Sequence, residues 1–136
     1  MWLGGVPFEG VDGLAGHSDG DAVCHALADA LLGAAALGDV GAHFPDGDPS
    51  IAGITGADLL GRTAELVRRA GFEVASCDMT VICERPAVSP RRDEMRAALA
   101  GALGIDPGRV SVKATRPEGL GLAGDGAGCL AIAVLT

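Results

Sequence analysis

Aromatic residues are scarce in this sequence, and tyrosine is missing altogether. Only 3% of the 136 residues are aromatic, which leaves one tryptophan and three phenylalanines. A surface that stacks the bases of RNA or single-stranded DNA depends on aromatic side chains, so this composition argues against such a function. The net charge of −8 also argues against a nucleic-acid partner, because phosphate binding requires basic patches.

Long apolar runs are missing as well. No apolar run reaches the roughly 18 residues that a membrane span needs. The first ten residues, MWLGGVPFEG, do not show the basic region followed by an apolar stretch that is typical of a signal peptide. We therefore expect a cytoplasmic protein without a membrane partner.

Basic residues are absent from the first part of the chain. Residues 1–61 contain nine acidic residues and no lysine or arginine, and Arg62 is the first base. Residues 62–136 contain the other nine acids and all ten bases. The early carboxylates are either solvated loop ends and helix caps, or some of them bind a metal ion or sugar hydroxyls.

The cysteines are few and do not form a recognisable framework. None of the four belongs to a C-x-x-C pair, and their spacing fits neither a zinc ribbon nor a set of disulfides. All lie in apolar surroundings, so we expect buried, reduced thiols. With 49% hydrophobic and 21% charged residues in 136, the composition predicts one folded domain with an ordinary core.

Hydrophobic periodicity, helix caps and turn residues predict a mixed succession of elements. Strands are expected at 2–6, 72–83, 109–115 and 129–135, and helices at 19–37, 56–70 and 91–103, with the first helix capped by Ser18 and Asp19. This order predicts an α/β fold of the two-layer α+β type, in which helices pack on one face of a mixed β-sheet. A loop of 16 residues at 38–53 is long enough to suggest a functional role.

The clearest cluster of polar residues is H-S-D-G-D-x-x-x-H, from His17 to His25. On a helix, Asp21, His25 and Asp29 share one face at spacings of four residues. A histidine between carboxylates is similar to the carboxylate–histidine–metal arrangement of zinc sites. The alternative is a core histidine held by hydrogen bonds, and one histidine alone is not a zinc site because three protein ligands are usual.

Two loops carry further candidate residues. Asp39 follows a predicted helix end, where a carboxylate is disfavoured by the helix dipole, so it either binds ligand hydroxyls or simply makes a turn. Gly119–Gly124 matches G-x-G-x-x-G but leads into a strand, which excludes a dinucleotide fingerprint. Backbone N–H groups of such a loop can still hold phosphate oxygens. Just upstream, the candidate sources of charge and of a metal ligand are Lys113, Thr115, Arg116 and Glu118.

The stretch LAGHSDGDAVCHALADALLGAAALGDVGAHFPDGDP resembles the 2-C-methyl-D-erythritol 2,4-cyclodiphosphate synthase family. The likeness continues through the D-x-T-V-I segment at Asp78, the RRDEMR helix and the V-K-A-T-x-x-E-G-L-G segment from Val112. It covers nearly the whole chain. It implies a homotrimer of compact α/β subunits with active sites between neighbours, and a lyase that acts in non-mevalonate isoprenoid biosynthesis.

The resemblance implies that this lyase converts 4-diphosphocytidyl-2-C-methyl-D-erythritol 2-phosphate to 2-C-methyl-D-erythritol 2,4-cyclodiphosphate and CMP. It implies divalent metals: Zn²⁺ at His25, and Mg²⁺ or Mn²⁺ at the diphosphate through Glu118. His17 and Arg116 are the candidate catalytic residues, Arg116 standing where the family has a threonine that assists the transition state. The candidate substrate-binding residues are His17, Ser18, Asp39, Val40, Gly41, Phe44, Pro45, Asp46, Gly47, Asp48, Cys83, Pro86, Ser89, Thr115, Glu118, Leu122 and Asp125.

The sequence departs from the family pattern in several places. The family opens with G-x-G-x-D-x-H, whose Asp and His complete the zinc site, so residues 1–136 are expected to form a single domain without the family's first strand. Arg116-Pro117 replaces two threonines, Asp125 replaces an arginine and Ala87 replaces a lysine. Two rival hypotheses remain open: a non-catalytic trimer that binds a cytidine nucleotide or an isoprenoid diphosphate, and a metal-dependent phosphohydrolase.

Overall fold

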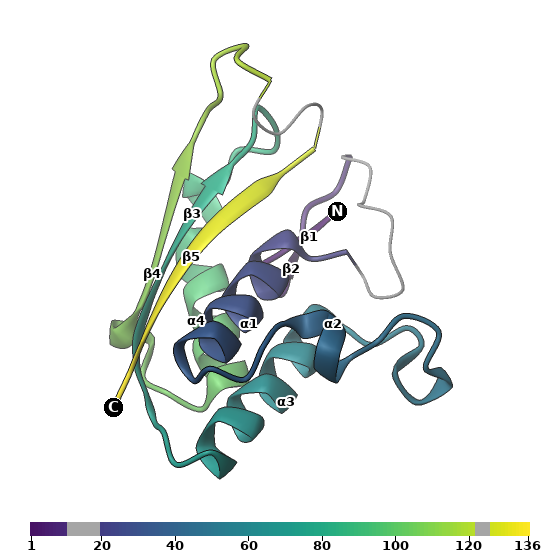
Figure 1. Ribbon diagram of the computed structural model, residues 1–136. Helices are drawn as coiled ribbons and strands as arrows, with labels where there is room; N and C mark the ends of the chain where they lie inside the picture. Colours follow the sequence, from purple (N-terminus) through teal and green to yellow (C-terminus); the bar gives the residue numbers. More distant parts are fainter. Residues whose placement is uncertain (11–19, 122–125) are drawn as a thin grey trace.

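The computed structural model describes residues 1–10, 20–121 and 126–136 (Figure 1). The helices and strands follow one another along the chain in an order close to the predicted one. They are β1 (Trp2–Leu3), β2 (Val6–Pro7), α1 (Ala22–Ala34), α2 (Val40–His43), α3 (Gly56–Arg69), β3 (Val74–Ile82), α4 (Arg92–Leu103), β4 (Val110–Thr115) and β5 (Gly128–Leu135). Three short 3-10 turns, Pro49–Ile51, Ser89–Arg91 and Pro107–Arg109, connect some of them.

The main sheet has three strands in the order β4-β3-β5. β3 pairs in parallel with β4 and antiparallel with β5, so the predicted mixed sheet is confirmed. Parallel pairing of β3 with β4 requires a crossover, which α4 provides. Because both strands run the same way, the loops that follow them emerge at the same edge of the sheet.

The helices cover one face of this sheet, as predicted (Figure 1). α1 packs against β5 and β3, α4 packs against β4, and α3 packs against α1 and α4. Alternate residues of β3, among them Cys77, Met79 and Val81, point into the core and are buried. Burial raises the pKa of the Cys77 thiol to about 11 and that of Cys129 to about 12, which keeps both protonated.

The first segment is a hairpin, and the predicted single strand at 2–6 is wrong. Gly4 and Gly5 adopt left-handed backbone angles, with φ of 62° and 77°, and reverse the chain between β1 and β2. Trp2 therefore pairs with Pro7 and Leu3 with Val6 in a separate two-stranded sheet. Apolar residues on both sides of the glycines hid a turn that requires positive φ at two successive positions.

The Asp21 carboxylate joins this hairpin to the start of α1. Its two oxygens are buried and accept hydrogen bonds from four backbone N–H groups: Gly4 at 2.8 Å, Gly5 at 2.7 Å, Val23 at 3.1 Å and Cys24 at 3.0 Å. Two of these groups are helix N–H groups that lack an intrahelical partner. One side chain thus caps the central helix and fixes the turn of the hairpin.

Two further expectations need correction. α1 begins at Ala22 with Asp21 as its N-cap, whereas the predicted helix began at 19; its predicted caps, Ser18 and Asp19, lie outside the described residues. The predicted loop at 38–53 contains the short helix α2 and a 3-10 turn. Both differences have the same cause. Aspartates that the sequence pattern assigns to a helix or a loop act as N-caps in the structure.

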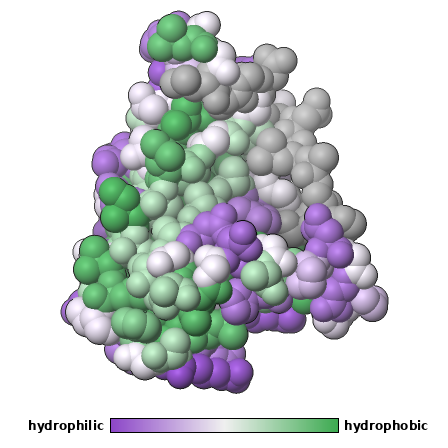
Figure 2. All heavy atoms as spheres, in the orientation of Figure 1, coloured by the Kyte–Doolittle hydropathy of each residue, from purple (hydrophilic) through white to green (hydrophobic). Residues whose placement is uncertain are grey.

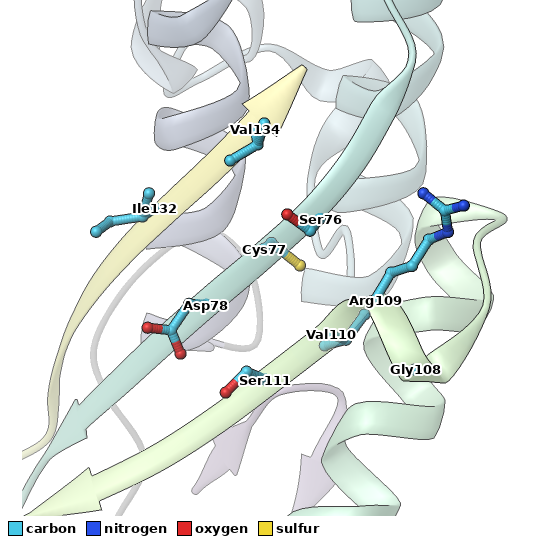
Figure 3. Close-up of a pocket in the computed structure, with 9 residues that line it drawn as sticks. All are labelled: Ser76, Cys77, Asp78, Gly108, Arg109, Val110, Ser111, Ile132 and Val134. Atoms are coloured by element: carbon cyan, nitrogen blue, oxygen red, sulfur yellow. The ribbon is translucent and has the colours of Figure 1, made fainter. Parts of the chain in front are cut away.

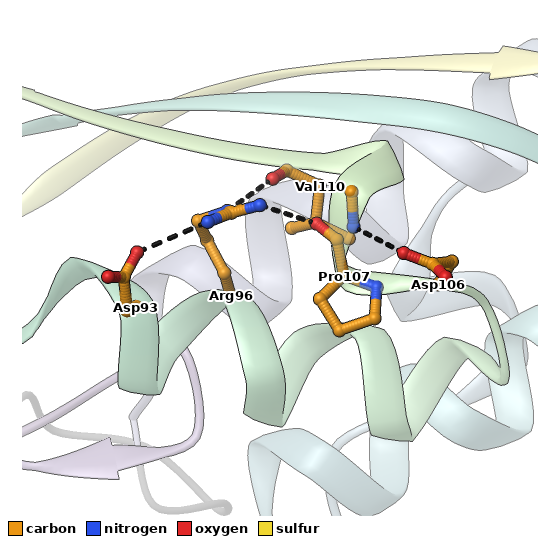
Figure 4. A network of polar contacts seen from close by, with 6 residues as sticks. Asp93, Arg96, Asp106, Pro107 and Val110 are labelled. Atoms are coloured by element: carbon orange, nitrogen blue, oxygen red, sulfur yellow. Dashed lines mark hydrogen bonds and ion pairs between the residues drawn. The ribbon is translucent and has the colours of Figure 1, made fainter.

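Arg96 fastens α4 to the start of β4 (Figure 4). Its guanidinium donates to the carbonyl oxygens of Val110 at 2.8 Å and Pro107 at 2.9 Å, and pairs with Asp93 at 3.1 Å. Asp106 accepts a hydrogen bond from the N–H of Gly108 at 2.7 Å in the same connection. The crossover between the two parallel strands is therefore closed by a planar group that satisfies two main-chain carbonyls.

No helix in the described part of the chain covers the other face of the sheet. Leu130, Ile132 and Val134 of β5 are 68%, 66% and 50% exposed, and Figure 2 shows apolar residues on the side of the molecule where the sheet lies. Next to them, Lys113 pairs with Asp78 at 2.8 Å, and this contact lowers the pKa of Asp78. Among the described residues, no helix is long and apolar enough to cross a membrane.

We predict that Asp21→Ala destabilises the protein by roughly 2–4 kcal/mol, because two turns of main chain lose a shared charged acceptor inside the core. Urea unfolding followed by circular dichroism measures this change. The exposed Asp58, in the first turn of α3, provides the control, and Asp58→Ala is expected to cost less than about 1 kcal/mol. Equal losses for the two variants would contradict the role assigned to Asp21.

Candidate active site

Two of the predicted site segments meet at the carboxyl ends of β3 and β4. Ile82 and Thr115 are paired in the last register position, and the N–H of Cys83 donates to the carbonyl oxygen of Thr115 at 3.2 Å. The segment from Cys83 to Ser89 and the segment from Thr115 to Glu118 therefore start side by side. The carboxyl edge of parallel strands is where ligands bind in many α/β proteins.

The first of these segments is a tight turn anchored by Cys83. Its thiol is buried and donates to the carbonyl oxygen of Pro86 at 3.6 Å. Burial raises the pKa of this thiol, the Glu84 carboxylate raises it further, and Arg116 opposes both effects. Cys83 thus acts as a structural group, while Ser89 begins an exposed 3-10 turn.

The second segment ends in a reverse turn from Pro117 to Leu120. The N–H of Leu120 donates to the carbonyl oxygen of Pro117 at 3.0 Å. Glu118 and Gly119 occupy the centre of the turn with φ of 52° and 77°. A glutamate in the left-handed region is uncommon, and such conformations gather at functional sites.

The two segments are also linked by a side chain that our sequence reading missed. Glu84 accepts a hydrogen bond from the N–H of Gly119 at 3.1 Å, across 35 positions of sequence. Nothing in the sequence pattern marks Glu84, because only the pairing of β3 with β4 brings it near Gly119. Thr115, Arg116 and Glu118 are exposed beside this link.

His25 is half-buried on α1, and its ring has a defined tautomer. Nδ1 lies 2.8 Å from the carbonyl oxygen of Asp21, and because a carbonyl only accepts, Nδ1 carries the proton. The lone pair of the neutral ring is then on Nε2, the orientation that metal-binding histidines have. The group that fixes Nδ1 is a main-chain carbonyl, where the sequence pattern had suggested a carboxylate.

Asp29 and Asp39 both act on the backbone of α2. Asp29 accepts from the N–H of Val40 at 2.8 Å, and Asp39 accepts from the N–H of Ala42 at 2.9 Å as N-cap of this helix. The unfavourable position that suggested a ligand-binding role for Asp39 therefore has a local explanation. The Asp39 side chain is nevertheless exposed at the surface, and the exposed Gly41 lies beside it.

The rest of the predicted loop is mostly exposed. Phe44 is half-buried and packs against the core, while Pro45, Asp46 and Gly47 are exposed. Asp48 accepts from the N–H and the hydroxyl of Ser50 at 2.9 and 2.8 Å, and these hydrogen bonds lower its pKa. The loop is thus held at both ends by aspartates that cap short helical turns.

In one copy of the chain, α2 and its loop lie away from the loops that follow β3 and β4 (Figure 1). The candidate residues therefore form two groups that a single chain does not bring together. Four other candidates, His17, Ser18, Leu122 and Asp125, lie outside the described residues.

A groove of about 300 Å³ lies elsewhere, on the uncovered face of the sheet (Figure 3). Asp78, Ser111, Ile132 and Val134 are among its lining residues, and none of the candidate site residues is. Oδ1 of Asp78 is buried and has no hydrogen-bond partner in the part of the chain that the structure describes. The groove belongs to the sheet surface and not to the candidate active site.

Fold and loops together define a two-layer domain in which two turns meet at the carboxyl ends of two parallel strands. The YgbB family model matches residues 1–136. The chain belongs to the YgbB family, and its predicted likeness to cyclodiphosphate synthases is confirmed. No cluster of three metal-binding side chains is present among residues 1–10, 20–121 and 126–136.

The chain is similar to several named proteins. It is 55% identical over 132 residues to "Bifunctional enzyme IspD/IspF" of Anaeromyxobacter sp. (strain Fw109-5), covering 97% of this chain and 34% of that protein. It is 51% identical over 132 residues to "2-C-methyl-D-erythritol 2,4-cyclodiphosphate synthase" of Pelotomaculum thermopropionicum, covering 97% of this chain and 82% of that protein. The chain therefore spans about a third of the length of the bifunctional relatives.

The same fold occurs in solved structures. A structure of 2C-methyl-D-erythritol-2,4-cyclodiphosphate synthase in a CDP-bound form superposes with a TM-score of 0.91 at 31% identity, covering 100% of this chain and 89% of that one. The bifunctional IspDF of Campylobacter jejuni gives a TM-score of 0.91 at 37% identity, covering 99% of this chain and 37% of that one.

We predict that Asp29→Ala speeds hydrogen exchange of the Val40 amide at least several-fold and lowers stability by about 1 kcal/mol, because α2 loses its tie to α1. Mass-spectrometric hydrogen exchange on peptides that cover residues 38–44 measures the effect. Asp29→Asn is the matched control, since the amide oxygen still accepts the bond. Unchanged exchange in the alanine variant would exclude this role.

Proposed function

We propose that this chain carries active-site segments of an enzyme that cyclises 4-diphosphocytidyl-2-C-methyl-D-erythritol 2-phosphate to 2-C-methyl-D-erythritol 2,4-cyclodiphosphate, with release of CMP. The observation that supports it most is the pairing of the Cys83–Ser89 turn with the Glu118 turn at the carboxyl ends of β3 and β4. The names of the relatives agree with it. We place the reaction in the cytoplasm and in isoprenoid biosynthesis.

The reaction is an internal phosphoryl transfer. An oxygen of the 2-phosphate attacks the β-phosphorus, the bond between this phosphorus and its bridging oxygen breaks, and CMP leaves with that oxygen. Catalysis of such a step consists of positioning and charge neutralisation. In our proposal, main-chain groups of the Cys83–Ser89 turn hold the cytosine, and the Thr115–Glu118 segment holds the diphosphate.

The residues present fit a magnesium or manganese ion at the diphosphate. Mg²⁺ in such sites is bound by one or two carboxylates together with substrate phosphates, and Glu118 offers an exposed carboxylate next to the proposed diphosphate segment. When bound, the ion neutralises the phosphate charges that repel each other. Arg116 adds a positive charge at the same segment.

For zinc, the fit is limited to one ligand. His25 has the tautomer that a zinc ligand needs, but zinc sites use at least three protein ligands, and the described residues do not assemble such a group. We therefore assign no step of the reaction to zinc. For His25 we propose only the role of a metal ligand.

We further propose that the chain works as a homotrimer with active sites between neighbouring copies. Three features support this: the apolar face of β5, the Oδ1 of Asp78, which is buried without a partner among the described residues, and the separation of the two groups of candidate residues. The uneven distribution of charge also favours contact between different surfaces of neighbouring copies, because residues 1–61 contain no base and residues 62–136 contain all ten. The loop after α2 in one copy would then meet the turns after β3 and β4 in the next.

Assembly is tested by light scattering coupled to size-exclusion chromatography at micromolar concentration. We expect a mass three times that of the 13.5 kDa chain, and a monomer for Ile132→Glu, because the substitution places a charge on the apolar face. Ala97→Glu, on an exposed position of α4, is the control and is expected to remain a trimer. A monomeric parent protein would refute the assembly.

Catalysis is tested by following CMP and the cyclic diphosphate by mass spectrometry with Mg²⁺ or Mn²⁺. We expect residues 1–136 to bind CDP with little turnover, and the chain extended by a D-x-H segment ahead of Trp2 to form product. Asp39→Ala in the extended chain is expected to lower turnover by at least about a hundredfold, since errors of about 1 Å in positioning have effects of this size. The trimer should remain intact.

The same assay separates the second candidate function, a non-catalytic trimer that binds a cytidine nucleotide. Arg116-Pro117 in place of two threonines favours this alternative, because a hydroxyl of the family's site is lost. An extended chain that folds and binds zinc and CDP, yet makes no product, would refute the synthase and support the binding protein.

A further inference from the structure

The turn from Pro117 to Leu120 has a main-chain geometry that needs support from outside. Both central residues have positive φ, 52° at Glu118 and 77° at Gly119, which is the pattern of a type I′ turn. Glycine adopts this conformation freely, whereas a residue with a side chain is disfavoured there. Glu118 therefore keeps its conformation only if other contacts hold the turn.

The hydrogen bond of the turn itself involves its two ends, the N–H of Leu120 and the carbonyl oxygen of Pro117. The N–H of Gly119 belongs to the peptide group that joins the two central residues. It takes no part in this bond and needs another acceptor. Glu84 Oε1 accepts from it at 3.1 Å. A side-chain oxygen that accepts from this N–H satisfies the group and so supports a turn that is otherwise disfavoured.

The position of Glu84 in the chain allows it to hold the Glu118–Gly119 turn in place. It directly follows Cys83, whose side chain is buried and whose N–H extends the β3–β4 ladder by bonding the carbonyl oxygen of Thr115. The main chain at Glu84 is therefore anchored to the sheet, whereas the turn that it holds stands beyond the end of β4 (Figure 1).

We propose that Glu84 is a positioning residue, which holds the Glu118–Gly119 turn through the Gly119 N–H and so directs the Glu118 carboxylate toward the metal-bound diphosphate. This inference rests on the proposed function for the role of Glu118. The role of Glu84 is to accept one hydrogen bond, and its negative charge as such is not required. Supporting contacts of metal ligands typically change metal affinity by 10–100-fold when removed.

Three variants of the extended chain test this inference. Glu84→Ala removes the acceptor, and Glu84→Gln keeps an amide oxygen at the same place while removing the charge. Glu65→Ala is the matched control, because Glu65 is an exposed glutamate on α3 that pairs with Arg69 only four residues away. Circular dichroism and light scattering confirm that each variant is folded and assembled before comparison.

The first measurement is hydrogen exchange of the Gly119 amide in metal-free protein, resolved by NMR. Glu84→Ala is expected to exchange at least tenfold faster than the parent, with Glu84→Gln and Glu65→Ala within threefold of it. The second is binding of Mn²⁺ in the presence of CDP, followed by electron paramagnetic resonance. Here Glu84→Ala is expected to weaken Mn²⁺ binding roughly tenfold, within the range for supporting contacts.

Turnover provides the third measurement. Glu84→Ala is expected to lower kcat at least tenfold at saturating substrate and to leave KM within threefold, with substantial rescue by Glu84→Gln. The inference is overturned if Glu84→Ala matches the parent in exchange and Mn²⁺ binding, or if Glu84→Gln is as defective as Glu84→Ala. If the parent makes no product, the synthase proposal fails, while exchange and Mn²⁺ binding still decide the role of Glu84.

Discussion

The Asp21 carboxylate is the contact on which the arrangement of the domain depends. It lies where the hairpin β1–β2, the first turn of α1 and the core converge, and its oxygens serve backbone N–H groups of both elements. Its main-chain carbonyl in turn fixes the ring of His25. A single residue therefore determines where α1 begins, how the hairpin is seated and which nitrogen of His25 is protonated.

Much of the fold was predictable, because the long helices and strands show a clear hydrophobic periodicity in the sequence. The helix at 56–70 and the strands at 72–83 and 109–115 were expected within two residues of α3, β3 and β4. The hairpin at Gly4 and Gly5 was missed, since the pattern of apolar residues did not reveal the left-handed turn. The N-cap role of Asp39 was not predicted for a related reason: an N-cap is recognisable only once the following residues are known to be helical.

The site was predictable only in part. Family motifs located the two turns, but their contact depends on the register of β3 with β4, which places Ile82 opposite Thr115. Glu84 escaped notice because nothing local distinguishes it from a solvated glutamate. The pairing of Asp78 with Lys113 was not predicted, because it joins neighbouring strands that are far apart in sequence. A single sequence contains little information about contacts between segments that are far apart along the chain.

The parallel pairing of β3 with β4 has a consequence for how such a protein can change. The distance between the two turns is determined by main-chain hydrogen bonds, and these persist whatever side chains the turns carry. Exposed positions such as Arg116 and Ala87 can therefore be exchanged for other residues without disturbing the frame that holds them. New ligand preferences can arise on this scaffold by substitution alone, whereas a single inserted residue in either strand would shift the register and separate the turns.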